Sequence, residues 1–172
     1  MNKGVLIWIT GLSGAGKTAI GSEVYKILKE KYSNTIFVDG DVIRDLFNND
    51  LGHTITDREQ NAYRIANLCS FLTSQNMIVI CSTMSLFDDI HSFNKINNEI
   101  YYEVYVDVSI EELKRRNSKG IYSNTNDSKA KNVIGIDLSY DIPKNPFMII
   151  DNSDIKISAN IKALEIIRKI NF

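Results

Sequence analysis

The most constraining feature of the sequence is the run Gly-Leu-Ser-Gly-Ala-Gly-Lys-Thr at residues 11–18, which matches the phosphate-loop pattern G-x-x-x-x-G-K-[ST]. A short apolar run at residues 5–10 precedes it and predicts a buried strand, and apolar residues at helical spacing follow it. Glycines between a strand and a helix let backbone N–H groups and the helix dipole converge on one anion. The sequence therefore predicts a nucleoside triphosphate site formed by Gly11, Ser13, Gly14, Ala15, Gly16, Lys17 and Thr18.

Two side chains of this loop are suited to the phosphates and their metal ion. We expect Lys17 to neutralise charge on the β- and γ-phosphates of ATP, and the hydroxyl of Thr18 to bind Mg²⁺. The alternative interpretation is a chance glycine-rich turn, and the strand before it and the helix after it argue against that.

Composition excludes several other classes of protein. A chain of 172 residues with 44% hydrophobic and 24% charged residues is typical of one globular domain, predicted over residues 1–172. The net charge of -1 gives no support for nucleic acid as a partner. Because no signal peptide or membrane-spanning run is legible, we expect a cytoplasmic protein with no membrane partner. Cys69 and Cys81 are expected in the core, and the two histidines are too separated for a zinc site.

Short apolar runs alternate with helical patterns along the whole chain. Further buried strands are predicted at 35–38, 77–81, 102–108 and 147–150, and helices at about 42–47, 58–74, 87–98 and 110–116. Ser158 is expected to cap a closing helix that buries Ile161, Leu164 and Ile167. This alternation predicts an α/β fold of the P-loop NTPase type, with a parallel sheet of about five strands and helices on both faces.

An Asp-Gly-Asp sequence directly follows the second predicted strand. Asp39 and Asp41 therefore fall at the carboxyl end of a parallel strand, where ligands bind in open α/β sheets. Asp-Gly is also a hairpin signal, but no alternating strand follows it. A functional role is favoured over a simple turn.

Two further segments of the chain are rich in polar residues. On the helix predicted at 58–74, which we expect Asp57 to cap, Arg58, Asn61 and Arg64 recur three residues apart, and a solvated face is the simplest interpretation. Residues 117–143 form a polar stretch that is longer than an ordinary connection. We predict that this stretch is a lid, and the basic residues at its start favour a lid that reaches the phosphates.

The ordered set of these motifs resembles the adenylylsulfate (APS) kinase family from residue 9 to about residue 151. Besides the phosphate loop, the resemblance rests on Asp-Gly-Asp-Val-Ile-Arg at 39–44, Asp-Leu-Gly at 50–52 and the lid motifs Lys-Gly at 119–120 and Gly-Ile-Asp at 135–137. Members of the family transfer the γ-phosphoryl group of ATP to the ribose 3′-hydroxyl of adenylylsulfate. The resemblance therefore implies an ATP- and Mg²⁺-dependent kinase with a small nucleotide acceptor, and a homodimer.

The resemblance also implies roles for individual residues. Asp39 matches the base on the acceptor hydroxyl, Asp41 a residue that assists it or orients Mg²⁺ through water, and Lys119 the lid lysine near the transferring phosphate. Arg116 is expected at the ATP site. The residues expected to bind the acceptor are Asp39, Arg44, His53, Arg58, Asn61, Ser85, Leu86, Lys119, Val133 and Ile134.

The chain departs from the family where the adenine of adenylylsulfate is held between two Phe rings. Those positions are His53 and Val133 here, and Leu-Phe-Asp at 86–88 stands where family members have Pro-Tyr-Arg. Losing two stacking rings weakens adenine recognition. The rebuilt segments resemble a branch of the family that phosphorylates cytidine diphosphoramidate on the route to capsular O-methyl phosphoramidate. We therefore expect that acceptor, with adenylylsulfate as the alternative.

A GTPase-type switch is a third interpretation of the phosphate loop. It would need guanine recognition by Asn-Lys-x-Asp, and the nearest match, Asn-Lys-Ile-Asn at 94–97, lacks the acid and falls on a predicted helix. The sequence therefore favours a kinase over a switch.

Overall fold

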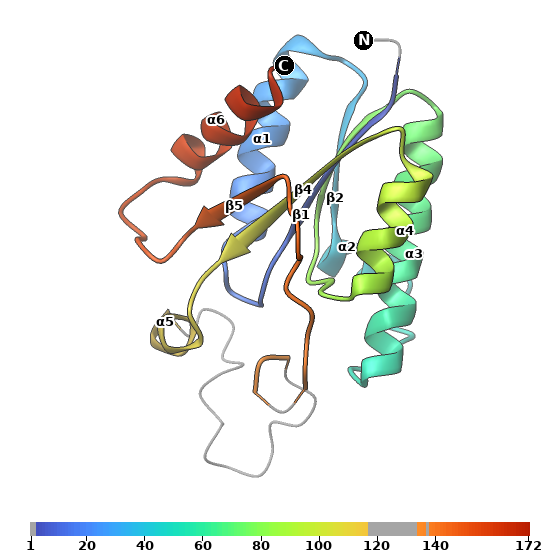
Figure 1. Ribbon diagram of the computed structural model, residues 1–172. Helices are drawn as coiled ribbons and strands as arrows, with labels where there is room; N and C mark the ends of the chain where they lie inside the picture. The colour runs from blue at the N-terminus through green and yellow to red at the C-terminus, as the bar shows by residue number, and fades with distance from the viewer. Residues whose placement is uncertain (1–2, 117–133, 137) are drawn as a thin grey trace.

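The computed structural model describes residues 3–116, 134–136 and 138–172. Its five strands form one parallel sheet in the order β2-β3-β1-β4-β5 (Figure 1). The strands are β1 (Val5–Thr10), β2 (Thr35–Asp39), β3 (Ile78–Ser82), β4 (Ile100–Asp107) and β5 (Met148–Asp151). The helices are α1 (Lys17–Lys31), α2 (Gly40–Leu46), α3 (Ile55–Ser74), α4 (Asp88–Asn97), α5 (Ile110–Arg116) and α6 (Ala159–Ile170).

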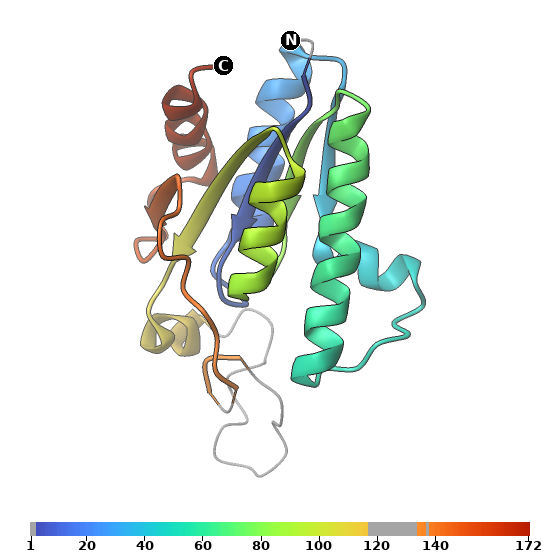
Figure 2. The ribbon, with the colours of Figure 1, turned by 45° about the vertical axis from the view of Figure 1, so that its right-hand side comes forward.

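Helices cover both faces of this sheet, as predicted. α1 and α6 lie together on one face, and α3 and α4 lie together on the other (Figures 1 and 2). Every residue of the neighbouring central strands β1 and β3 is buried, with Trp8 fully enclosed. A parallel strand covered on both faces has no solvent side, which explains why these strands read as continuous apolar runs.

The start of α3 differs from the prediction. The helix begins at Ile55, and its cap is Thr54, whose hydroxyl accepts from the backbone N–H of Asp57 at 3.2 Å. Asp57 returns the interaction by accepting from the N–H of Thr54 at 3.2 Å, which completes a capping box. The expectation that Asp57 itself caps the helix was wrong, because the hydroxyl three residues earlier takes that position.

The closing helix α6 is capped as predicted but is rotated relative to the expected face. Ser158 accepts from the N–H of Ile161 at 3.4 Å. However, Ile161 is exposed, and the buried positions of α6 include Lys162, Ala163 and Ile166. Of the expected face, Ile161 was wrong, whereas Leu164 and Ile167 are half-buried and Ile167 packs against the core. The fully buried Lys162 could not be recognised from an apolar pattern.

The remaining composition-based expectations concern cysteines, metals and membranes. Cys69 and Cys81 are both buried and free, as expected of core residues, and burial beside Cys69 raises the pKa of the Cys81 thiol. Within the described residues, no three His, Cys, Asp or Glu side chains gather as they would around a metal ion. No helix of the described chain is long and apolar enough to cross a bilayer.

The predicted lid at 117–143 falls largely on residues 117–133 and 137, which lie outside the described part of the chain. Of the part that is described, Ile134 is buried and forms an isolated bridge with Leu138. The N–H of Asp141 donates to the carbonyl of Leu86 at 3.0 Å. This anchors the end of the segment beside the start of α4.

Candidate active site

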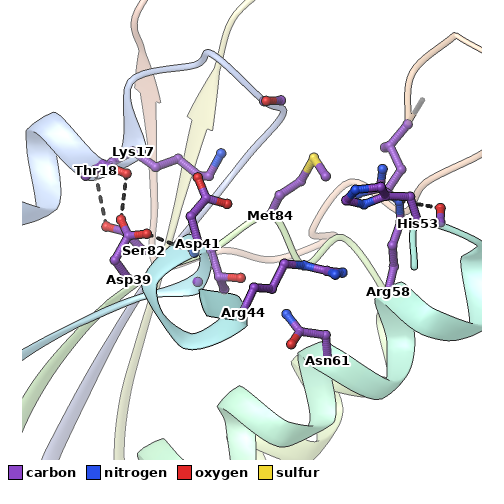
Figure 3. Close-up of a pocket in the computed structure, with 14 residues that line it drawn as sticks. Lys17, Thr18, Asp39, Asp41, Arg44, His53, Arg58, Asn61, Ser82 and Met84 are labelled. Carbon is purple, nitrogen blue, oxygen red and sulfur yellow. Dashed lines mark hydrogen bonds between the residues drawn. The ribbon is translucent and has the colours of Figure 1, made fainter. Parts of the chain in front are cut away.

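The carboxyl ends of β1, β2 and β3 meet at one edge of the sheet, where a cavity opens. The pairing register of β2 with β3 places Asp39, at the end of β2, beside Ser82, at the end of β3. Figure 3 shows the side chains that converge there from the phosphate loop, α2 and α3. The cavity is lined by Ser13, Lys17, Thr18, Asp39, Gly40, Asp41, Arg44, His53, Arg58, Asn61, Ser82, Thr83, Met84 and Ile134.

The phosphate loop has the backbone that its glycines permit. Gly14 and Gly16 have φ of 77° and 96°, in the left-handed region that strains any residue with a Cβ. Gly16 precedes α1, and no side chain of the described residues caps that helix. An uncapped N-terminus with its positive dipole end is what an anion-binding helix needs. The Lys17 ammonium group lies across the loop and donates to the carbonyl of Leu12 at 2.8 Å.

Asp39 connects the phosphate loop to the Asp-Gly-Asp motif. Its Oδ2 accepts from the Thr18 hydroxyl at 2.7 Å, and its Oδ1 accepts from the N–H of Asp41 at 2.9 Å (Figure 3). The second bond makes Asp39 the N-cap of α2. Asp41, on the first turn of α2, lines the same cavity. Two carboxylates and a hydroxyl therefore stand beside the predicted phosphate site.

These oxygens also suit a magnesium ion. Mg²⁺ prefers hard oxygen ligands and is usually held by one or two protein groups, with water and substrate phosphates completing its shell. Thr18, held by Asp39 beside the loop, would therefore suit a Mg²⁺ ion bound with the phosphates, and Asp41 could assist through water. A hydroxyl that ligates a metal through its oxygen keeps its proton, so Thr18 can bind the ion and still donate to Asp39.

The far side of the cavity is formed by a short segment held by two arginines. Arg44 donates to the carbonyls of Leu51 and Gly52, both at 3.1 Å. Arg58 donates from Nε to the carbonyl of His53 at 3.0 Å. His53 is largely exposed, but partial desolvation by its neighbours, together with the positive charge of Arg58 and Arg44, lowers its pKa. His53 is therefore a neutral imidazole at neutral pH, able both to donate and to accept a hydrogen bond.

The polar stripe on α3 divides into two parts. Arg58 and Asn61 line the cavity, so for them the solvated-face interpretation is wrong. Arg64 instead binds the two carboxylate oxygens of Asp50 at 2.9 and 2.7 Å and lies 4.0 Å from the centre of the Phe47 ring. Arg64 thus fastens the segment that leads from α2 to His53, and the ion pair lowers the pKa of Asp50.

Two predicted acceptor residues do not reach the cavity. Ser85 and Leu86 are fully buried, and the carbonyl of Ser85 accepts from the Thr10 hydroxyl at 2.9 Å. The expectation that they contact the acceptor is corrected, because the chain after β3 turns into the core at these positions. The residues of that stretch that do line the cavity, and that sequence analysis missed, are Ser82, Thr83 and Met84. Their position at the end of β3, next to β2, is the signal that could have identified them.

The other predicted residues are placed as follows. Arg116 contacts the turn after β5, with its Nη2 donating to the carbonyls of Asn152 at 2.5 Å and Ser153 at 2.9 Å, and it does not line the cavity. Its Nε donates to Glu112 at 2.8 Å, and this pair together with Arg115 lowers the pKa of Glu112 to about 2. The predicted residues Lys119 and Val133 lie outside the described residues.

Comparison with known proteins agrees with this geometry. The family model described as adenylylsulphate kinase matches residues 3–151. The cytidine diphosphoramidate kinase of Campylobacter jejuni is 39% identical over 155 residues, covering 88% of each chain. The adenylyl-sulfate kinase of Clostridium kluyveri is 36% identical over 151 residues, covering 87% of this chain and 76% of the relative.

A solved structure extends the match to three dimensions. The Mycobacterium tuberculosis APS kinase CysC in complex with AMPPNP and APS superposes with a TM-score of 0.88 at 28% identity, covering 100% of both chains. Both parts of the resemblance seen in the sequence, to the APS kinases and to the cytidine diphosphoramidate enzyme, are confirmed. The chain is a kinase, and it belongs to the adenylylsulphate kinase family.

Proposed function

We propose that this kinase transfers the γ-phosphoryl group of ATP to the ribose 3′-hydroxyl of cytidine diphosphoramidate. The observation that carries the proposal is the base end of the cavity. Its described lining includes His53, Met84 and Ile134, and no aromatic ring other than the imidazole. The relative that is 39% identical is named for this acceptor, as a cytidine diphosphoramidate kinase. The product would serve the assembly of capsular O-methyl phosphoramidate.

The phosphate end supports a direct phosphoryl transfer. Lys17 would neutralise charge on the transferring group. Thr18, oriented by its bond to Asp39, would ligate Mg²⁺, which would supply further positive charge at the phosphates. Asp39 accepts the proton of the acceptor hydroxyl. An ionised carboxylate offers about four lone-pair positions, and bonds from the described residues occupy two of them on Asp39, which leaves positions for a ribose hydroxyl. Asp41 assists from the adjacent turn.

The acceptor end supports an anionic nucleotide. Arg44 and Arg58 line the cavity and would bind the diphosphate bridge through charge-assisted hydrogen bonds. The side-chain oxygen of Asn61 is buried and has no hydrogen-bond partner among the described residues. A buried acceptor without a partner is costly, so Asn61 is suited to receive a hydrogen bond from the acceptor.

Adenylylsulfate is the second candidate acceptor. The family model and several curated relatives favour it, since they are named for that activity. Both candidates carry an anionic bridge on a ribonucleotide, so the base must discriminate between them. Cytosine offers a smaller stacking face than adenine, and one or two contacts to a base are worth about 10–200-fold in specificity.

A coupled ADP-release assay tests the proposal. The kcat/KM values are compared for cytidine diphosphoramidate, adenylylsulfate, CDP and CMP at equal ATP and Mg²⁺. We expect cytidine diphosphoramidate to be preferred over adenylylsulfate by about 10–200-fold. A preference for adenylylsulfate would assign the protein to sulfate assimilation instead. Resemblance to the family also leads us to propose a homodimer, which light scattering of the purified protein would test.

A further inference from the structure

The turn that follows β5 lies against the phosphate loop. The Asn152 Nδ2 donates to the carbonyl of Ala15 at 2.6 Å, across 137 positions of sequence. A Cβ placed on Gly16 would stand 2.4 Å from the same nitrogen. The Asn152 amide therefore occupies the space that the missing side chain of Gly16 leaves open. No motif in the sequence singles out this asparagine.

This contact fixes the orientation of one peptide unit of the loop. The peptide between Ala15 and Gly16 is planar and trans, so its C=O and N–H point in opposite directions. Because Asn152 holds the carbonyl on the outside, the N–H of Gly16 faces the inside of the loop. A peptide that precedes a glycine is easily rotated, because the glycine accepts either sign of φ. Without Asn152, the carbonyl of this peptide is able to turn toward the phosphates.

A buried cation orients the Asn152 amide. Lys162, in α6, is only 2% exposed, and its ammonium group donates to Asn152 Oδ1. Lysine can only donate and a carbonyl can only accept, so the two partners together decide which end of the amide faces Ala15. The backbone of Asn152 is held as well, by its N–H bond to the carbonyl of Asp107 at 2.9 Å and by Arg116. Both the backbone position and the side-chain orientation of Asn152 are therefore fixed.

We propose that Asn152, oriented by Lys162, is a positioning residue for ATP: it holds the Ala15–Gly16 peptide so that the Gly16 N–H points at the phosphates. The inference rests on the use of ATP and is independent of which acceptor is phosphorylated. Lys162 acts through Asn152, so its removal matters only while Asn152 is present.

Asn152→Asp is the most direct test. The substitution preserves shape and strengthens the pair with Lys162, but it places a carboxylate oxygen against the carbonyl of Ala15. We expect the folded protein to be as stable as wild type, and its Kd for AMPPNP, measured by calorimetry, to rise about ten-fold. Asn67→Asp is the matched control, since Asn67 donates a similar amide bond to the carbonyl of Tyr63 at 2.8 Å on the exposed side of α3. It should leave the Kd unchanged.

Inorganic tripolyphosphate distinguishes an effect on the loop from a contact with the nucleoside. If Asn152 acts on the phosphate loop, Asn152→Asp weakens tripolyphosphate and AMPPNP by the same factor. If only AMPPNP is weakened, or neither is, the proposal is overturned. A double-mutant cycle supplies the second check: Lys162→Met should raise the Kd about three-fold alone and have no effect in an Asn152→Ala background. Equal effects of Lys162→Met in both backgrounds would show that Lys162 does not act through Asn152.

Discussion

Replacing Asp39 by Asn tests the centre of the proposed mechanism, because the change keeps the shape of the side chain and removes its charge. Asp39 accepts two hydrogen bonds, from Thr18 at 2.7 Å and from the N–H of Asp41 at 2.9 Å. Asparagine has one acceptor oxygen, so it can accept only one of these bonds, and its amide nitrogen would face the other partner. Asn is as good a helix N-cap as Asp, so we expect its oxygen to keep the bond from the N–H of Asp41 and its amide nitrogen to donate to the Thr18 hydroxyl.

The effect on folding should be small and the effect on turnover large. Exchanging a charge-assisted bond at a partly exposed site for a neutral one costs about 1 kcal/mol, which lowers Tm by about 2–4 °C in a chain of this size. Loss of the proton acceptor should reduce kcat by about 10²–10⁴, with the KM for ATP within a few-fold of wild type. The concentration of Mg²⁺ required for half-maximal rate should rise, because Thr18 is no longer oriented by a negative charge.

The assay is coupled ADP release at saturating ATP and acceptor, with Mg²⁺ titrated for each variant. Asp45→Asn is the control, since Asp45 lies on the same helix but is exposed and does not line the cavity. It should retain wild-type kcat. If Asp39→Asn kept more than about a tenth of wild-type kcat, or if Asp41→Asn were the more damaging change, Asp39 would not be the base.

Three further predictions follow from the site. Lys17→Ala should abolish turnover in a folded protein, with acceptor binding less affected, as single-turnover assays and circular dichroism would show. Arg64→Met should raise the KM for the acceptor and leave that for ATP unchanged, because it releases Asp50 and Phe47 from α3 but touches nothing in the phosphate loop. Partial desolvation and two neighbouring guanidinium groups lower the pKa of His53 from 6.5. The unfolded chain therefore binds this proton more readily, and a small part of the stability is lost as the pH falls below 6.5, because the exposed imidazole is screened by solvent. Denaturant unfolding at several pH values should show a smaller acid loss in His53→Phe, and an equal loss would contradict the assignment.

Features set by neighbouring residues could be read from the sequence. The phosphate loop, the alternation of strands and helices, and the Ser158 cap depend on contacts within a few residues, and the structure has them where predicted. Family resemblance added the acceptor side, where Arg44 and His53 do line the cavity. One failure is also local in origin: Thr54 and Asp57 both suit a helix start, and only the folded backbone shows which one caps α3.

Contacts between distant segments were decided by the tertiary structure. Asn61 and Arg64 are one helical turn apart, yet one faces the cavity and the other fastens Asp50, because the packing of α3 against the sheet fixes its rotation. Met84 rather than Leu86 reaches the cavity because the chain enters the core after Met84. Asn152 meets the phosphate loop only because the order of strands in the sheet brings the turn after β5 beside α1.

The sequence by itself determined the chemistry of the phosphate site. Which distant side chains complete it depended on strand order and helix rotation, and these are set by the burial of the whole core rather than by any local pattern.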